Sequence, residues 1–266
     1  MTTAVVVPTR QSSRTLRDCL LALRRQTVPC TVVVVDNDSS DGTVGLAAQL
    51  ADHVVSGGPE RSSQRNIGAR SVDADVLVFV DSDMVLEPTV VAEVENAIRD
   101  GAGAVVIPER TIGTGFFARV RALERSFYTT QSGVEAARGF RASLFNELGG
   151  FDEDLTGPED WDLTIRAGAL ASIVQTKSGI LHDEGRVRYV DACRRKAYYA
   201  EGLRKFARKH GRRGIGVALD RPWLRRPWAL FYPDPVLGFG VVALKLGEAT
   251  AVTWTLLRHA IAQRRP

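Results

Sequence analysis

The sequence has few of the features of secreted or disulfide-stabilised proteins. Only three of its 266 residues are cysteines, Cys19, Cys30 and Cys193, and their wide spacing forms neither a C-x-x-C pair nor a disulfide framework. It contains no internal repeat, low-complexity tract or long heptad pattern, and its first apolar run is five residues long with no cleavage site after it. We therefore expect reduced thiols, no secretory signal and a cytoplasmic protein.

Lysine is also scarce, since five lysines accompany thirty arginines, and the formal net charge is only +4. Hydrophobic residues make up 44% and charged residues 25%, which is typical of a globular protein and excludes disorder as the default. Residues 186–226 hold fourteen Lys/Arg against three Asp/Glu. No nucleic-acid-binding motif accompanies this charge, so we expect no nucleic-acid partner.

Short apolar runs alternate with amphipathic segments through the first 110 residues. Strands are expected at 2–8, 30–36, 53–58, 75–81 and 102–108, and helices at 12–27, 41–51, 61–72 and 88–101. This alternation predicts an α/β fold with a mostly parallel sheet and helices on both faces. After residue 110 the pattern changes to a loop and helix over 111–133, and then to two helices around a glycine turn within 139–168.

Two of the expected strands end in pairs of acidic residues. Asp36 and Asp38 follow the valines of "VVVVDND", and Asp81 and Asp83 follow "VLVFV". In open α/β sheets, ligands bind beyond the carboxyl ends of the strands, and carboxylates there suit Mg²⁺ or Mn²⁺ bridging to phosphates. The alternative is that such acids cap the next helix, which is the favoured interpretation for Asp41.

Six short motifs in this order resemble the family 2 glycosyltransferases, which have the GT-A fold. They are "VVVPTR", "VVVVDNDSSDGT", "RNIGAR", "VFVDSDM", "GGFDEDL" and "GPEDWDLTIR", and the match covers about residues 2–185. The resemblance implies a Rossmann-like nucleotide-sugar half at 1–110, a catalytic and acceptor half at 111–185, and a helical C-terminal extension at 186–266. It also implies a nucleotide-diphospho-sugar donor, typically a UDP-sugar, and a Mn²⁺ or Mg²⁺ cofactor.

The resemblance assigns the donor-binding residues one by one. They match the family's first-strand end, its base-binding pair, the helix beside the nucleotide and the D-x-D motif: Pro8, Thr9, Arg10, Asp36, Asn37, Arg61, Arg65, Asn66, Asp81, Ser82 and Asp83. The common form of the base-binding pair is Asp-Asp, so Asn37 departs from it and leaves the identity of the base open. Asp83 is assigned to the metal, and Asp81 to the ribose or sugar.

The resemblance also implies an inverting displacement with Asp160 of the "ED" motif as general base. The alternative for Glu159, Asp160 and Asp162 is that they are first-turn acids stabilised by the helix dipole. His182 matches the third metal ligand of many GT-A enzymes or is an ordinary satisfied histidine. Three further positions are assigned to the acceptor together with Glu159, and they are Trp161, Gly150 and Phe151. Trp161 and Phe151 have packing as their alternative.

The C-terminal extension predicts contact with a membrane surface through 186–266. Its basic part has three interpretations: a solvated helical face, a patch for anionic lipid headgroups, or a loop that closes on the diphosphate. Residues 236–257 are long enough to span a bilayer, which takes ~20 residues. Because Lys245 and Glu248 lie near the centre and one turn apart, we expect them to pair in an interfacial or packed helix. We therefore expect a peripheral protein on the cytoplasmic membrane face, with a hydroxyl acceptor that is lipid-linked or soluble.

Rival hypotheses come from two other classes. A GT-A module that binds a nucleotide sugar without catalysis requires loss of the metal or base carboxylates, but Asp81, Asp83 and Asp160 are all present. A haloacid-dehalogenase-type phosphatase leaves the second D-x-D and the ED helix unexplained. A sugar-nucleotide pyrophosphorylase requires a glycine-rich first loop, which "PTRQSSRT" does not provide.

Overall fold

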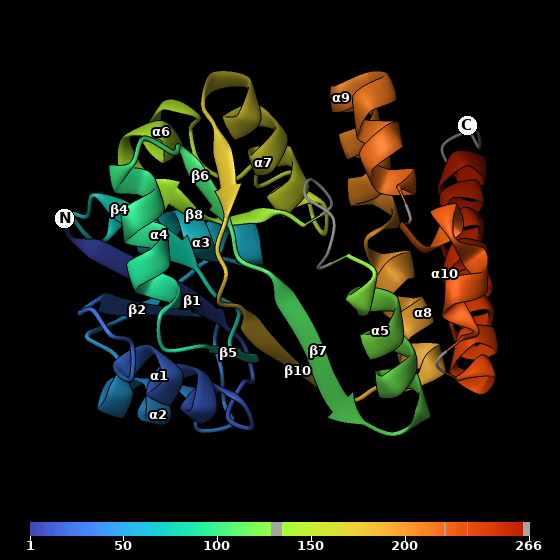
Figure 1. The fold of residues 1–266 in the computed structure, drawn as a ribbon, viewed down its shortest axis with the longest axis horizontal. Helices are drawn as coiled ribbons and strands as arrows, with labels where there is room; N and C mark the ends of the chain where they lie inside the picture. Colours follow the sequence, from blue (N-terminus) through green and yellow to red (C-terminus); the bar gives the residue numbers. More distant parts are fainter. Residues whose placement is uncertain (129–134, 221, 233, 263–266) are drawn as a thin grey trace. The chain divides into compact units, whose positions relative to one another are not determined.

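The computed structural model describes residues 1–128, 135–220, 222–232 and 234–262. The chain divides into two compact units (Figure 1). Unit 1 comprises residues 1–110, 135–153 and 159–183, and unit 2 comprises residues 111–134, 154–158 and 184–266.

Unit 1 contains the alternating strands and helices. In chain order its elements are β1 (Thr3–Thr9), α1 (Leu16–Arg24), β2 (Thr31–Asp36), α2 (Thr43–Leu50), β3 (His53–Ser56), α3 (Arg61–Arg70), β4 (Val76–Phe79), β5 (Met84–Leu86), α4 (Val90–Arg99), β6 (Ala104–Val106), β8 (Ala137–Arg141), α6 (Ala142–Glu147), α7 (Glu159–Leu170) and β9 (Ile173–Gln175). Strands β7 (Glu109–Thr114) and β10 (Ile180–Arg186) begin in unit 1 and end in unit 2.

A seven-stranded sheet in the order β3-β2-β1-β4-β8-β6-β9 forms the centre of unit 1. Its neighbouring strands are parallel, except that β8 runs antiparallel to both β4 and β6. The expected mostly parallel sheet is therefore confirmed. A smaller sheet has the order β5-β10-β7, in which His182 of β10 lies opposite Met84 of β5.

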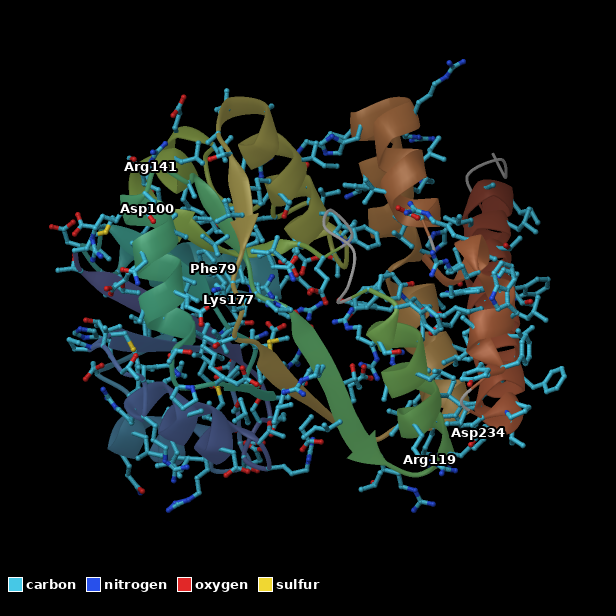
Figure 2. All side chains as sticks on the ribbon, in the orientation of Figure 1. Phe79, Asp100, Arg119, Arg141, Lys177 and Asp234 are labelled. Carbon is cyan, nitrogen blue, oxygen red and sulfur yellow. The ribbon has the colours of Figure 1, made fainter. Side chains whose placement is uncertain are left out.

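Helices cover both faces of the large sheet, as the sequence predicted. Along β1, Val5 and Val7 join a core cluster that includes residues of α1 and α4. Ala4 and Val6 point the other way and join a cluster that includes residues of α3, α6 and α7. This alternation follows from the two-residue period of a strand, and β1 is buried along its whole length. Phe79, labelled in Figure 2, packs in the second cluster against the rings of Phe145 and Phe151.

The structure differs from the predicted elements in a few places. Strand β1 continues one residue past Pro8, and residues 111–114 continue β7 where a loop was expected. Strands β5, β8 and β9 were not predicted, because they are short and β8 reads "ARGFR" with no apolar run. In β8 a Cβ on Gly139 would lie 2.7 Å from a methyl of Val94, so only glycine fits against α4. Residues 129–133 of the predicted helix lie outside the described residues.

Unit 2 is helical. Its elements are α5 (Phe116–Ser126), α8 (Tyr189–Tyr198), α9 (Ala200–Leu219), the short 3₁₀ helices η1 (Pro222–Arg225) and η2 (Pro227–Leu230), and α10 (Pro235–Ala262). Asp234, labelled in Figure 2, begins α10 by accepting the backbone N–H groups of Val236 and Leu237 at 2.9 and 3.2 Å. Helix α10 is long and apolar enough to cross a membrane by length and composition alone.

The inner face of α10 packs on α5 and α8. Val241 and Leu244 of α10 are fully buried in a core cluster with Val120 of α5 and Ala192 of α8. Within this interface the Lys245 ammonium lies 2.8 Å from Glu248, which confirms the predicted pair, and 2.7 Å from Glu124 of α5. Burial raises the pKa of Glu124, but Lys245 outweighs it and holds the pKa below its usual range.

Candidate active site

The carboxyl ends of β1 and β2 bring the first group of predicted residues together. The parallel register places Pro8 opposite Val35 and Thr9 opposite Asp36. Asp36 is buried, and its carboxylate accepts hydrogen bonds from the Thr9 hydroxyl at 2.9 Å and from the Ser39 hydroxyl and N–H at 2.7 and 2.8 Å. These bonds fix the turn after β2.

Asn37 and Arg10 directly follow the carboxyl ends of β2 and β1. Asn37 donates its backbone N–H to the Thr9 carbonyl and its side-chain amide to the Pro59 carbonyl. Arg10 is exposed. Gln64 of α3, which the sequence analysis did not single out, donates to the carbonyls of Thr9 and Val35 at 2.9 and 2.7 Å. The β1 and β2 ends are thereby held against α3.

Asp41 has the capping role that was favoured for it. Its carboxylate accepts from the Thr43 hydroxyl and backbone N–H at the start of α2, and from the Ser13 N–H. The Thr43 hydroxyl bond lowers the pKa of Asp41 well below its usual range. Asp162 likewise forms a structural pair, with the Arg166 guanidinium 2.8 Å away, and Arg166 also donates to the Leu148 and Gly150 carbonyls.

The two aspartates of the D-x-D motif lie in different surroundings. Asp81 is mostly buried, and its carboxylate lies 2.7 Å from the Arg65 guanidinium and 3.6 Å from that of Arg138. Burial alone would raise the pKa of Asp81, but the guanidinium groups outweigh it and hold the pKa well below its usual range. Asp83 keeps 37% of its side chain exposed and has His182 as its neighbour. The residue between them, Ser82, donates its hydroxyl to that of Ser12.

His182 lies between two carboxylates. Its Nε2 is 3.3 Å from Asp83 Oδ2, and its Nδ1 is 3.5 Å from Glu109 Oε2. Burial would lower the pKa of His182, but the neighbouring carboxylates of Asp83 and Glu109 outweigh it and raise the pKa to about 9. Glu109 is itself fixed by the Arg138 Nε at 2.6 Å. The structure therefore brings His182 to Asp83, as the resemblance implied.

Arg65 joins the D-x-D motif to the start of α7. It is fully buried, and while one of its terminal nitrogens contacts Asp81, the other lies 2.7 Å from Asp160 and 3.4 Å from Glu159. Its guanidinium also lies over the Phe151 ring, 5.1 Å from the centroid. The Arg65 guanidinium therefore contacts Asp81 through one terminal nitrogen and Asp160 through the other.

Glu159 and Asp160 differ in exposure. Glu159 is 2% exposed, whereas the Asp160 side chain is 25% exposed. Burial and the charge of Asp160 raise the pKa of Glu159, while Arg65 and Arg61 oppose the rise. Arg61 lies 3.6 Å from Glu159 and is 41% exposed. Asp160 is therefore the carboxylate of this pair with access to solvent.

Three of the predicted residues maintain the turn before α7. Asn66 accepts the Phe151 N–H and donates to the Phe151 carbonyl and to Glu153, all at 2.9 Å. Gly150 has a φ of 76°, and a Cβ there would lie 2.5 Å from the Asn66 amide oxygen. Phe151 is 3% exposed and packs in the core. These contacts give Gly150 and Phe151 a structural role, and Trp161 is half-buried. Contact of these three residues with the acceptor stays a prediction.

Two charged residues of this site were not predicted. Arg138 and Glu109 extend the row of alternating charges that runs from Asp83 through His182, Glu109, Arg138, Asp81 and Arg65 to Asp160. Arg138 itself was the signal that could have identified this charge row, because it lies inside the buried strand β8. Charged residues are seldom buried unless they are paired.

The family model described as "Glycosyl transferase family 2" matches residues 4–153, which is more than half of the chain. This chain belongs to glycosyltransferase family 2. A relative from Mycobacterium tuberculosis, a pre-mycofactocin glycosyltransferase, is 30% identical over 231 residues that cover 77% of this family 2 chain. The chain spans 47% of that relative's length.

Solved structures have the same fold as this glycosyltransferase family member. A mannosyltransferase from Pyrobaculum calidifontis in complex with GDP-Man and Mn²⁺ aligns with a TM-score of 0.62 at 19% identity, covering 99% of this chain and 81% of that one. Glucosyl-3-phosphoglycerate synthase from Mycobacterium tuberculosis, in complex with Mn²⁺, UDP-Glc and phosphoglyceric acid, aligns with a TM-score of 0.52 at 18% identity, covering 77% and 79%. The chain therefore has the GT-A fold that the resemblance implied.

Proposed function

We propose that this chain transfers a sugar from a nucleotide-diphospho-sugar, a UDP-sugar, to an acceptor hydroxyl with inversion at the anomeric carbon. The observation that carries the proposal is the Arg65 bridge, in which one buried guanidinium contacts both Asp81 and Asp160 at 2.7 Å. It brings the D-x-D motif and the candidate base to the same edge of the sheet. Family membership and neighbours solved with nucleotide sugars support the same class of donor.

The proposed reaction assigns one proton transfer to this chain. Asp160 accepts the proton of the acceptor hydroxyl while the hydroxyl oxygen forms a bond to the anomeric carbon. The bond from that carbon to the diphosphate breaks, and its electron pair leaves with the diphosphate oxygen. Arg65 orients the Asp160 carboxylate during this step, and Asp36 with Asn37 contact the base of the donor.

Asp83 and His182 are the residues proposed to hold a divalent metal ion. Their facing oxygen and nitrogen lie 3.3 Å apart, and both donor types suit Mn²⁺. Within the described part of the chain no three His, Cys, Asp or Glu side chains converge on one point. Asp83 and His182 would therefore hold the ion together with ligands from outside the chain, which suits an ion that also binds phosphate. Such an ion supplies positive charge to the leaving diphosphate.

Asp81 is not proposed as a metal ligand, because two guanidinium groups already face its carboxylate. We place it beside the ribose or sugar of the donor, with Pro8, Thr9 and Arg10 along the nucleotide. We place the protein in the cytoplasm, at the cytoplasmic face of the membrane, and its acceptor is a hydroxyl compound that is either lipid-linked or soluble.

A thermal-shift panel of nucleoside diphosphates and nucleotide sugars, each with and without Mn²⁺ or Mg²⁺, tests the donor site. A ligand that binds only the folded protein raises its melting temperature. We expect metal-dependent stabilisation by UDP-sugars. Stabilisation only by nucleotides of another base would replace uracil as the proposed base of the donor. If no ligand raised the melting temperature, the proposed donor site would be contradicted.

Two variants separate the proposed roles. Asp83→Ala should lose the metal-dependent part of donor binding, so near-wild-type UDP-sugar affinity with Mn²⁺ would remove Asp83 from the metal site. Asp160→Asn should keep donor binding but stop transfer, and substantial residual transfer would move the base elsewhere. Asp18→Asn, which changes an exposed carboxylate on α1, is the matched control and should behave as wild type.

A further inference from the structure

Helix α10 turns a long apolar face away from its own unit. Six large apolar side chains on it are 53–68% exposed: Val236, Phe239, Leu246, Trp254, Leu257 and Ile261. Their spacings are sums of three and four residues, so they lie along one side of the helix. We call these six residues the outer face of α10. It extends from Val236 to Ile261, which are 25 positions apart, or about 38 Å at 1.5 Å per residue.

The opposite side of α10 is fixed, so this face cannot turn inward. Val241 and Leu244 are fully buried against α5 and α8, and Lys245 contacts Glu124 of α5 at 2.7 Å. In Figure 2 side chains of α10 project away from α5 and α8 on the right of the view. If α10 left this packing to cross a bilayer, Lys245 and Glu248 would enter the hydrocarbon without Glu124. A helix held in this way lies on a surface and does not span it.

Exposed aromatic residues precede α10 in the sequence, and an arginine lies against its outer face. Trp228 and Tyr232, just before α10 in sequence, are 69% and 91% exposed, while Leu230 between them is buried in the unit 2 core. The Arg258 guanidinium lies over the Trp254 ring, 5.7 Å from its centroid. Tryptophan and tyrosine are enriched where proteins meet lipid headgroups, and arginine keeps its charge at the interface while its stem lies on apolar surface.

Charge is divided unequally between the two units. Unit 2 holds 21 Lys/Arg against 8 Asp/Glu, a net of +13, whereas unit 1 holds 14 against 23, a net of −9. A unit of this charge is attracted to anionic lipid headgroups. Two copies that met through the outer face would bring two such units together, and their like charges would oppose the contact. The charge therefore favours an anionic bilayer as the occupant.

We propose that the outer face of α10, together with Trp228 and Tyr232, is a docking surface for an anionic lipid bilayer. The helix lies in the plane of the interface with its apolar side chains among the acyl chains and its arginines at the headgroups. This surface narrows the membrane contact predicted for residues 186–266 to α10 and η2. It does not depend on the proposed transferase activity, because it uses no residue of the active site.

Vesicle sedimentation of the full chain tests the proposal. The probes are vesicles of phosphatidylcholine alone and vesicles that also contain phosphatidylglycerol, each at low and high salt. We expect tight binding to the anionic vesicles at low salt and a blue shift of tryptophan emission on binding. Brominated lipids should quench that emission, and Trp228→Phe/Trp254→Phe should remove most of the quenching.

Two pairs of variants locate the surface. Leu246→Gln/Trp254→Gln should lower the partition coefficient about tenfold or more, because it removes apolar area from the outer face. Its control, Leu170→Gln/Val190→Gln, changes two apolar residues on α7 and α8 that are also more than half exposed, and it should bind as wild type. Arg258→Gln should weaken binding to anionic vesicles about fivefold, because it removes the charge beside Trp254. Arg188→Gln/Arg194→Gln, on the basic stretch, is its control and should cost less.

Several results would overturn the proposal. One is a wild-type chain that does not bind anionic vesicles at low salt. Another is a Leu246→Gln/Trp254→Gln variant that keeps its melting temperature and still binds as wild type, or a loss of binding confined to the Arg188→Gln/Arg194→Gln variant. If the chain ignores vesicles and sediments as a dimer that Leu246→Gln/Trp254→Gln disperses, the outer face is an interface between copies. The thermal-shift response to nucleotides, measured without vesicles, reports on the active site separately.

Discussion

Removing Arg65 should destabilise unit 1 by several kcal/mol. Its guanidinium is fully buried and contacts Asp81 and Asp160 at 2.7 Å and Glu159 at 3.4 Å. In Arg65→Met these carboxylates lose that cation, and breaking a buried ion pair from one side typically costs about 3–5 kcal/mol. At roughly 2–4 °C per kcal/mol for a chain near this size, the melting temperature should fall by about 6–20 °C.

The pH dependence of this loss identifies its cause. Arg65 depresses the pKa of Asp81 and opposes the rise in the pKa of Glu159. A depressed carboxylate pKa stabilises the fold above the unfolded value, about 3.9–4.3, and that stabilisation is lost as the pH falls through the folded value. Without Arg65 both carboxylates take up protons more easily. The deficit of Arg65→Met should therefore be largest near neutral pH and should shrink toward about pH 5.

The assay is thermal unfolding of wild type and variants across that pH range. Arg61→Met is the control on the same helix, because Arg61 is 41% exposed and lies 3.6 Å from Glu159. It should cost no more than about 1 kcal/mol. An Arg65→Met protein as stable as wild type near neutral pH, or a deficit that does not change with pH, would refute the claim that Arg65 stabilises unit 1 by neutralising buried carboxylates.

Three further predictions concern other parts of the molecule. Because His182 must lose its proton to bind a metal and its pKa is raised to about 9, the apparent Mn²⁺ affinity with UDP should rise about tenfold per pH unit below that value. Isothermal titration would show this, and a flat profile would remove His182 from the ligand set. Gly150→Ala should lower the free energy of unfolding in urea by about 1–3 kcal/mol, because the added Cβ would meet Asn66. Gly149→Ala is its control and should cost less, because Gly149 has a similar φ of 74° but open space around its Cβ position. Lys245→Met should lower the free energy of unfolding by about 3–5 kcal/mol at pH values above the pKa of Glu124, and by less at acidic pH. A variant as stable as wild type would show that the Glu124 contact is not maintained in solution.

The sequence predicted the alternating half of unit 1 well, because its local signals agree with its tertiary structure. Valine runs became β1 and β2, buried on both faces, and the segments between them became helices. Strand β8 was not predicted, because two arginines and a glycine interrupt its sequence and leave no apolar run. It lies between β4 and β6 only because Gly139 packs against Val94 and Arg138 finds carboxylates, and neither condition is local.

The sequence predicted most residues of the candidate site but not which of them contact one another. The resemblance assigned Asp83, His182 and Asp160 to one active site, and the structure adds which groups face each other. That Arg65 contacts Asp81 and Asp160 depends on residues 16 and 95 positions away in the sequence. For the same reason the contacts of Asn66 and the core packing of Phe151 could not be predicted from sequence, because a motif residue that packs the core and one that faces a ligand look alike.

The alternating charges explain how this site holds four carboxylates close together at the edge of a buried sheet. Bare carboxylates there would neutralise by taking up protons, since burial disfavours the charged form. Arg138 lies between Glu109 and Asp81, and Arg65 lies between Asp81 and Asp160, so each buried carboxylate in the row has a cation within 3.6 Å. Only the two ends of the row, Asp83 and Asp160, keep a quarter or more of their side chains exposed. The exposed ends are the two positions to which the proposal assigns the metal and the general base, and the residues between them hold those ends in place.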